Sequence, residues 1–195
     1  MISGQVYREA VLSTMPDAYI KEHWSDFQHV TDSGILKEVA RDNNIPIENK
    51  VELARDYFIK NATEILGKNP CIEIPGAKAF FEACREKHPV GIATGCWKAS
   101  GEIKLGTAGF EIRETVLSSA CDYDSRDEIL ENCLSLLNGT KENVIYFGDA
   151  VWDIKTTNNL GWNFIGIGQK IQGQCPNWFP DYSDPNAIFE LISEL

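Results

Sequence analysis

Two acidic side chains follow a short apolar run in the second half of the sequence. Gly148-Asp149 follows Val144-Ile145-Tyr146-Phe147, and Asp153 lies four positions after Asp149. If a helix begins there, this spacing places both carboxylates on one face, about one turn apart. Two carboxylates that approach a common point suit Mg²⁺, which prefers oxygen ligands. The same pair also fits a plainer interpretation, as helix-capping residues that interact with the helix dipole.

A hydroxyl, a glycine and a guanidinium group also lie after predicted strands, as Asp149 does. Thr94-Gly95 follows the apolar run 90–93, and Arg126 follows Ser125 at a predicted helix start. The hydroxyl and the flexible backbone suit a phosphoryl oxygen, and the guanidinium group could neutralise a carboxylate or clamp a phosphate. Taken singly, Thr94-Gly95 is an ordinary strand-to-turn step and Arg126 a solvated first-turn residue. Their joint occurrence at successive strand ends makes Thr94 and Arg126 the candidate catalytic residues, and Gly95 joins them as a phosphate-binding candidate.

The elements that must position these residues alternate between strand and helix from residue 71 onward. We predict strands at 90–93, 115–117, 144–147 and 164–167, and helices after Pro75-Gly76, over 98–108, after Ser125, over 151–160 and after Asp184-Pro185. Such alternation is typical of an α/β fold with a parallel sheet, and the continuously apolar strands indicate cover on both faces. Ligands of such sheets bind outside the carboxyl ends of the strands, where the candidate residues lie.

Residues 1–70 show helical patterns and no convincing strand. Thr31-Asp32-Ser33 resembles an N-cap region before a helix that contains Ile35. Pro46 is expected to open a longer segment whose apolar stripe continues to Gly67. The chain is therefore expected to divide into an all-helical part at 1–70 and an α/β part at 71–195.

Composition excludes several partners and sites. The formal net charge of −11 argues against nucleic acid and anionic membranes, and a phosphate site in such a chain needs local positive charge. No apolar run is long enough to span a bilayer and the N-terminus has no signal pattern, so we expect a cytoplasmic protein. The six cysteines form no C-x-x-C pair, which argues against structural zinc and predicts buried reduced thiols.

At the candidate residues the sequence resembles the haloacid dehalogenase (HAD) superfamily. Thr94 matches the second family motif, and Gly148-Asp149 with Asp153 matches the fourth, whose acids help to hold Mg²⁺. The third motif is usually a lysine, and Arg126 takes its place here with the same charge and a different geometry. The resemblance implies a Rossmann-like three-layer core at 71–195, a helical cap at 1–70, and a Mg²⁺-dependent phosphatase of a small phosphorylated metabolite. Oligomeric state and substrate identity do not follow from it.

The first family motif, Asp-x-Asp-x-Thr after the first core strand, has no counterpart near the start of the chain. Ser3-Gly4-Gln5-Val6 looks like sequence that normally follows that motif, and Asp122-Tyr123-Asp124, the one Asp-x-Asp present, is interpreted as an acidic loop. We therefore expect the first core strand and the nucleophile to be absent, and the chain as written to be inactive. In its complete form the enzyme would act through an aspartyl-phosphate intermediate. The alternative is a degenerate, non-catalytic protein that binds a ligand or partner.

Overall fold

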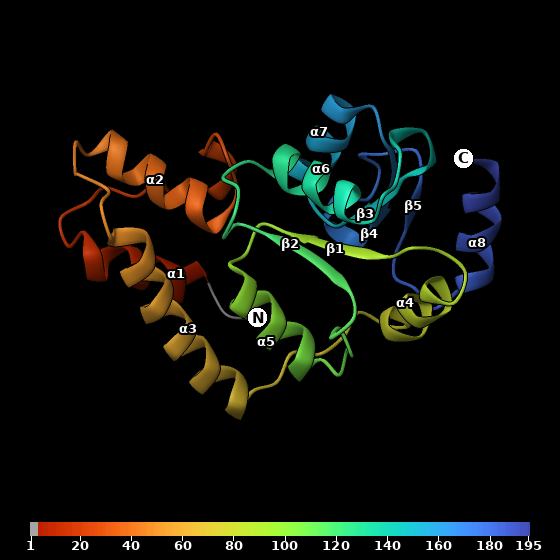
Figure 1. The fold of residues 1–195 in the computed structure, drawn as a ribbon, viewed down its shortest axis with the longest axis horizontal. Helices are drawn as coiled ribbons and strands as arrows, with labels where there is room; N and C mark the ends of the chain where they lie inside the picture. The colour runs from red at the N-terminus through yellow and green to blue at the C-terminus, as the bar shows by residue number, and fades with distance from the viewer. Residues whose placement is uncertain (1–3) are drawn as a thin grey trace.

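The computed structural model describes residues 4–195, so Ser3 of the segment 3–6 lies outside it. All regular secondary structure within residues 4–70 is helical, and these helices lie at one end of the molecule (Figure 1). They are α1 (Gly4–Thr14), the short 3-10 helix η1 (Trp24–Asp26), α2 (Asp32–Asp42) and α3 (Lys50–Lys68). The side chain of Thr31 accepts a hydrogen bond from Gly34 N and caps α2, as expected. The long helix begins at Lys50 and not at Pro46, because the intervening residues form a turn in which Lys50 N donates to Ile47 O.

The remaining elements alternate between helix and strand, which confirms the predicted α/β class. In chain order they are α4 (Ala77–Arg85), β1 (Gly91–Thr94), α5 (Lys98–Thr107), β2 (Val116–Ser119), α6 (Arg126–Leu136), η2 (Lys141–Asn143), β3 (Ile145–Gly148), α7 (Val151–Leu160), β4 (Asn163–Ile167), η3 (Gln169–Ile171), β5 (Trp178–Phe179) and α8 (Pro185–Glu194). Each strand and helix expected from the sequence is present within a few residues. Strand β5 was missed, because a two-residue strand has no periodicity to detect.

The parallel strands form two separate sheets in the described part of the chain. One sheet contains β1 and β2, and the other has the order β3-β4-β5. Helix α6 packs on both strands of the first sheet and also against α7, which packs on β3 and β4, so one helical layer covers both sheets. Strands β1 and β3 therefore each keep an edge without a strand partner among residues 4–195.

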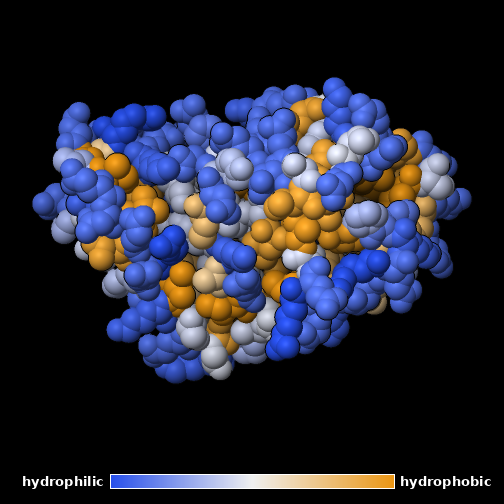
Figure 2. Space-filling model, viewed as in Figure 1, coloured by the Kyte–Doolittle hydropathy of each residue, from blue (hydrophilic) through white to orange (hydrophobic). Residues whose placement is uncertain are grey.

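The two strands with an unpartnered edge, β1 and β3, are also less buried than β4. All residues of β1 and β3 are only half-buried, whereas β4 ends in three buried residues. A parallel strand between two neighbours and two helical layers is normally buried along its length. Figure 2 shows apolar surface exposed at the centre of the face where Figure 1 draws these strands. Both observations agree with the expectation that a strand is missing between β1 and β3, which remains a prediction.

The apolar core of the helical part continues into the α/β part. Trp97, which precedes α5 and is fully buried, packs its ring 5.7 Å from Tyr7 of α1 and 5.8 Å from Phe58 of α3. Helix α3 ends at Lys68 and α4 begins at Ala77, so the expected division near residue 70 falls in a connecting loop. That these two parts are separate domains remains a prediction.

The cysteines depart from the expectation of buried thiols. All six are free, but only Cys133 is buried, Cys121 is exposed and the others are half-buried. No three His, Cys, Asp or Glu side chains within residues 4–195 are grouped closely enough to hold a metal ion. No helix in that range is both long and apolar enough to cross a membrane.

Candidate functional site

Asp153 is a buried carboxylate whose two oxygens are both occupied. It lies in the first turn of α7, and its Oδ2 accepts hydrogen bonds from Asp149 N at 3.2 Å and Ala150 N at 3.1 Å. Its Oδ1 accepts from Arg126 Nη1 at 2.9 Å. Burial raises the pKa of Asp153, while the Arg126 guanidinium group acts in the opposite direction. Asp153 therefore caps its helix, as the plainer interpretation expected, and also anchors Arg126.

Arg126 connects four parts of the molecule. It is the first residue of α6, whose start is set by a capping box between Ser125 and Glu128. Besides its bond to Asp153, its Nε donates to Val30 O of the N-terminal helical part at 3.2 Å. A Cβ atom at Gly95 would lie 3.0 Å from Arg126 Nη2, so the loop after β1 needs a glycine to approach this closely. The structure thus brings together three of the predicted site residues, Gly95, Arg126 and Asp153.

Asp149 and Thr94 lie at the carboxyl ends of β3 and β1 but are not joined to each other by any described contact. The Asp149 carboxylate is more than half exposed and lies 3.4 Å from Lys170 Nζ, a surface pair of small energetic value. The Oγ1 of Thr94 accepts from Cys96 N at 3.1 Å. That Thr94 faces Asp149 and Asp153 across one cleft stays a prediction.

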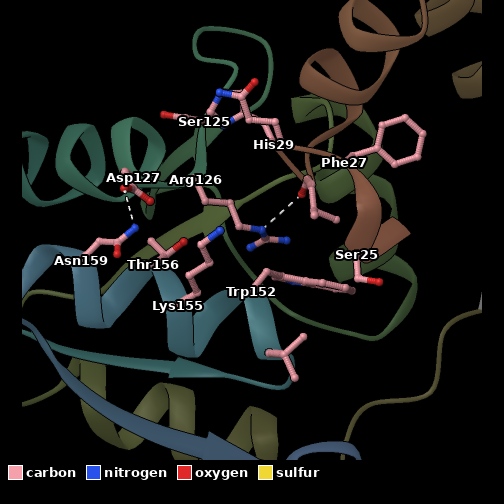
Figure 3. Close-up of a pocket in the computed structure, with 13 residues that line it drawn as sticks. Ser25, Phe27, His29, Ser125, Arg126, Asp127, Trp152, Lys155, Thr156 and Asn159 are labelled. Atoms are coloured by element: carbon pink, nitrogen blue, oxygen red, sulfur yellow. Dashed lines mark hydrogen bonds between the residues drawn. The ribbon is translucent and has the colours of Figure 1, made fainter. Parts of the chain in front are cut away.

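A cavity of about 510 Å³ lies on the side of Arg126 that faces residues 25–30, as Figure 3 shows. Its walls are residues 25–30, the start of α6 and one face of α7 as far as Asn159. The Arg126 guanidinium group lies over the ring of Trp152, 5.7 Å from its centroid, and Lys155 adds a second cation. Thr94, Gly95, Asp149 and Asp153 do not line this cavity. Arg126 therefore separates the cavity from the strand ends.

The acidic loop before α6 contacts α2 and the residue that caps it. Lys37 Nζ lies 2.7 Å from Asp124 Oδ2, and Thr31 Oγ1 donates to Asp124 O at 2.5 Å. Ser33 Oγ donates to Ala120 O and accepts from Trp97 Nε1 at 2.9 Å. Since Asp124 is paired with Lys37 of α2, the contacts favour an acidic loop over a displaced nucleophile.

Sequence reasoning treated Asp32 only as part of a helix cap and missed its place beside Thr94. Asp32 N donates to Gly95 O at 2.7 Å, and its Oδ2 accepts from Trp97 N at 2.9 Å. Burial raises the pKa of Asp32 from its ordinary value of 3.8 to about 6, against the opposing effects of the Trp97 hydrogen bond, Lys104 and Arg126. Its partners lie about sixty residues away in the chain, so no local pattern could have identified them.

The raised pKa of Asp32 predicts a stability effect with a definite sign. The folded state takes up a proton near pH 6 and the unfolded state near pH 3.8, so the unfolding free energy should fall as pH rises between these values. Asp32→Asn removes this titration and should gain roughly 2–3 kcal/mol relative to the wild type between about pH 4 and pH 7. Urea unfolding across that range measures the difference. Asp56→Asn, at an exposed site on α3, is the control. Parallel stability curves for Asp32→Asn and wild type would contradict the assignment.

Comparison with known sequences identifies the family of this chain. The sequence pattern of haloacid dehalogenase-like hydrolases matches residues 4–167, which is most of the chain. The chain belongs to this family of hydrolases. The resemblance seen at Thr94, Arg126, Asp149 and Asp153 is thereby confirmed for the family, though not for the role of each residue. No curated protein sequence matches the chain.

Solved structures of this family share the fold. A hydrolase from Pseudomonas syringae superposes with a TM-score of 0.72 at 17% identity, covering 96% of this chain and 90% of that one. β-Phosphoglucomutase from Clostridium difficile gives 0.70 at 15% identity, with 97% and 91% covered. CbbY from Rhodobacter sphaeroides, solved in complex with phosphate, gives 0.67 at 15% identity, with 94% and 90% covered. These likenesses establish the Rossmann-like α/β architecture of this haloacid dehalogenase-like chain.

Proposed function

We propose that this chain supplies the cap and most of the phosphate site of a phosphatase that acts on a small phosphorylated metabolite. The observation that carries the proposal is Arg126, a cation fixed by Asp153 and Val30 O beside Gly95. In a chain with a net charge of −11, a positive group held at the strand ends is the feature that an anionic substrate requires. The phosphate bound in the structure of CbbY is consistent with this substrate class.

The proposed roles follow from the contacts. Thr94 Oγ1 and the backbone N–H of Gly95 would bind the phosphoryl oxygens, since the N–H groups of Cys96 and Trp97 already donate to Thr94 Oγ1 and Asp32 Oδ2. Arg126 would stabilise the negative charge that develops on those oxygens during transfer, an effect worth a large part of the rate in such sites. Asp153 holds the guanidinium group by one oxygen and the backbone before α7 by the other, so it acts by positioning.

Asp149 is the residue proposed to hold Mg²⁺. Both oxygens of Asp153 already accept hydrogen bonds, whereas the Asp149 carboxylate is exposed and, within residues 4–195, contacts only Lys170, weakly. Mg²⁺ is commonly held by one or two carboxylates together with water and substrate phosphate, so the residues fit the ion as an incomplete set. When bound, the ion would supply positive charge to the phosphoryl oxygens.

The nucleophile is the part of the mechanism that residues 4–195 leave unassigned. Turnover of the proposed kind would need an aspartate that attacks phosphorus and forms an aspartyl-phosphate, which water then hydrolyses. Asp149 is proposed as a metal ligand, Asp153 is tied to Arg126, and Asp124 is paired with Lys37. We therefore propose that residues 1–195 alone bind phosphate but do not turn it over. The split between the β1 and β3 sheets also favours the second candidate, a non-catalytic protein that binds a phosphorylated ligand.

Metal and phosphate titration tests the proposed site. Calorimetry on residues 1–195 should show weak Mg²⁺ binding, because only one free carboxylate is provided, and inorganic phosphate should bind more tightly when Mg²⁺ is present. Asp149→Asn should abolish the Mg²⁺ signal, whereas Asp56→Asn on the distant α3 should leave it unchanged. Tight Mg²⁺ binding that survives Asp149→Asn would refute the metal assignment.

A further inference from the structure

Two half-buried charged side chains near Thr94 take part in no ion pair among the residues that the structure describes. Asp32 comes from the cap and Lys104 from α5. Lys104 Nζ donates to Cys96 Sγ at 3.1 Å, and no carboxylate within residues 4–195 forms an ion pair with it, although the nearby charge of Asp32 acts on it. Asp32 uses one oxygen for Trp97 N, and its other oxygen has no protein donor in residues 4–195. Partly buried charges are usually paired, so these two groups require an explanation.

Both groups contact the loop that follows Thr94. Cys96 N donates to Thr94 Oγ1, Cys96 Sγ contacts Lys104, and the next residue, Trp97, donates to Asp32. Gly101, one turn before Lys104, also lies against Thr94, since a Cβ atom there would be 3.5 Å from Thr94 Cγ2. The two charges therefore flank the residue proposed to bind the phosphoryl group.

At neutral pH each group carries its charge. Burial opposes the charge on Lys104, but Cys96 and Asp32 outweigh it and raise its pKa. Asp32 is ionised because neutral pH lies above its raised value of about 6. Arg126, the other cation near Asp32, is already paired with Asp153. Lys104 is thus the cation left for a ligand, and Asp32 the acceptor beside it.

We propose that Lys104 and Asp32 recognise the part of the substrate beyond the phosphoryl group. Lys104 binds a second anionic group and Asp32 accepts a hydrogen bond from a hydroxyl next to it. The substrate class is therefore a hydroxylated phosphomonoester with a second acid group, either a carboxylate or a second phosphate. This inference rests on the proposed phosphate site, because it places both residues around Thr94.

The test compares the affinities of residues 1–195 for four probes by calorimetry in the presence of Mg²⁺. Inorganic phosphate and glycerol 3-phosphate lack a second acid group, 3-phosphoglycerate has a carboxylate, and fructose 1,6-bisphosphate has a second phosphate. Since a charge-assisted bond contributes enough free energy for about a tenfold change in affinity, at least one of the last two should bind about tenfold more tightly than glycerol 3-phosphate. The probe with the larger gain identifies the second anion.

Matched variants separate the two residues. Lys104→Met should remove the preference for a second anion, while Lys98→Met, at an exposed position on the same helix, should keep it. Asp32→Asn should remove the preference for 3-phosphoglycerate over 3-phosphopropionate, which lacks the hydroxyl. The comparison of probes on the wild-type chain needs no variant and stands even if Lys104→Met does not fold.

The outcomes distinguish this inference from the function on which it rests. If phosphate and glycerol 3-phosphate bind but neither second-anion probe binds more tightly, the role of Lys104 is overturned and the phosphate site remains. A second-anion preference that persists in folded Lys104→Met has the same meaning. If none of the four probes binds, both the phosphate site and this inference are overturned.

Discussion

Joining an apolar strand followed by Asp-x-Asp-Gly-Thr to the N-terminal end of this chain should raise both its stability and its turnover. Strands β1 and β3 belong to two different parallel sheets, and within residues 4–195 each has a half-buried edge without a strand partner. A strand of about five residues placed between them would pair with both edges and cover apolar surface. Each unmet buried backbone group costs about 1–3 kcal/mol, against a typical total stability of about 5–15 kcal/mol, so the gain should exceed about 2 kcal/mol.

Urea unfolding and hydrolysis of p-nitrophenyl phosphate with Mg²⁺ measure the two effects. Residues 1–195 alone should show no turnover, whereas the extended chain should show Mg²⁺-dependent turnover. An extended chain with Asn-x-Asn at its strand end is the matched control, since it should keep the stability gain and lose the activity. Robust phosphatase activity from residues 1–195 alone would refute this prediction, and Asp122 and Asp124 would then be the nucleophiles to test.

Loss of the Arg126 guanidinium group should be the most damaging single substitution at the site. Arg126→Met leaves the buried Asp153 carboxylate without its counter-ion, although two backbone N–H groups still bind it. Breaking a buried ion pair from one side typically costs about 3–5 kcal/mol, and we expect the lower end of that range here. In the extended enzyme the same change should also lower turnover by roughly 10²–10³-fold, because it removes a charge that stabilises the transferring phosphoryl group.

A second substitution separates the two effects of Arg126. The double variant Arg126→Met with Asp153→Asn should recover most of the stability, since no unpaired charge remains, but should not recover turnover. Arg113→Met, at an exposed position, is the control and should change neither quantity. Denaturant unfolding and steady-state kinetics measure both. Stability and turnover that are unaffected by Arg126→Met would mean that Arg126 is an ordinary surface residue.

Local pattern determined the class of fold and the positions of most elements. The capping box at Ser125 and the Pro185 helix start are set by neighbours in sequence, and the strands of β1, β3 and β4 by short apolar runs. From the strand ends we predict that Thr94, Arg126, Asp149 and Asp153 share one edge, because parallel strands share a direction. These features depend on interactions between residues close together in the sequence, so the sequence alone predicts them.

The tertiary structure decided what each of these side chains does there. Asp149 and Asp153 have the same chemistry and helical spacing, but only Asp153 points into the core toward Arg126, while Asp149 faces solvent and Lys170. Asp32 looks like a capping residue until the fold brings Trp97 and Gly95 against it. Burial and charge at these positions come from segments tens of residues away, so only the packed fold could set them.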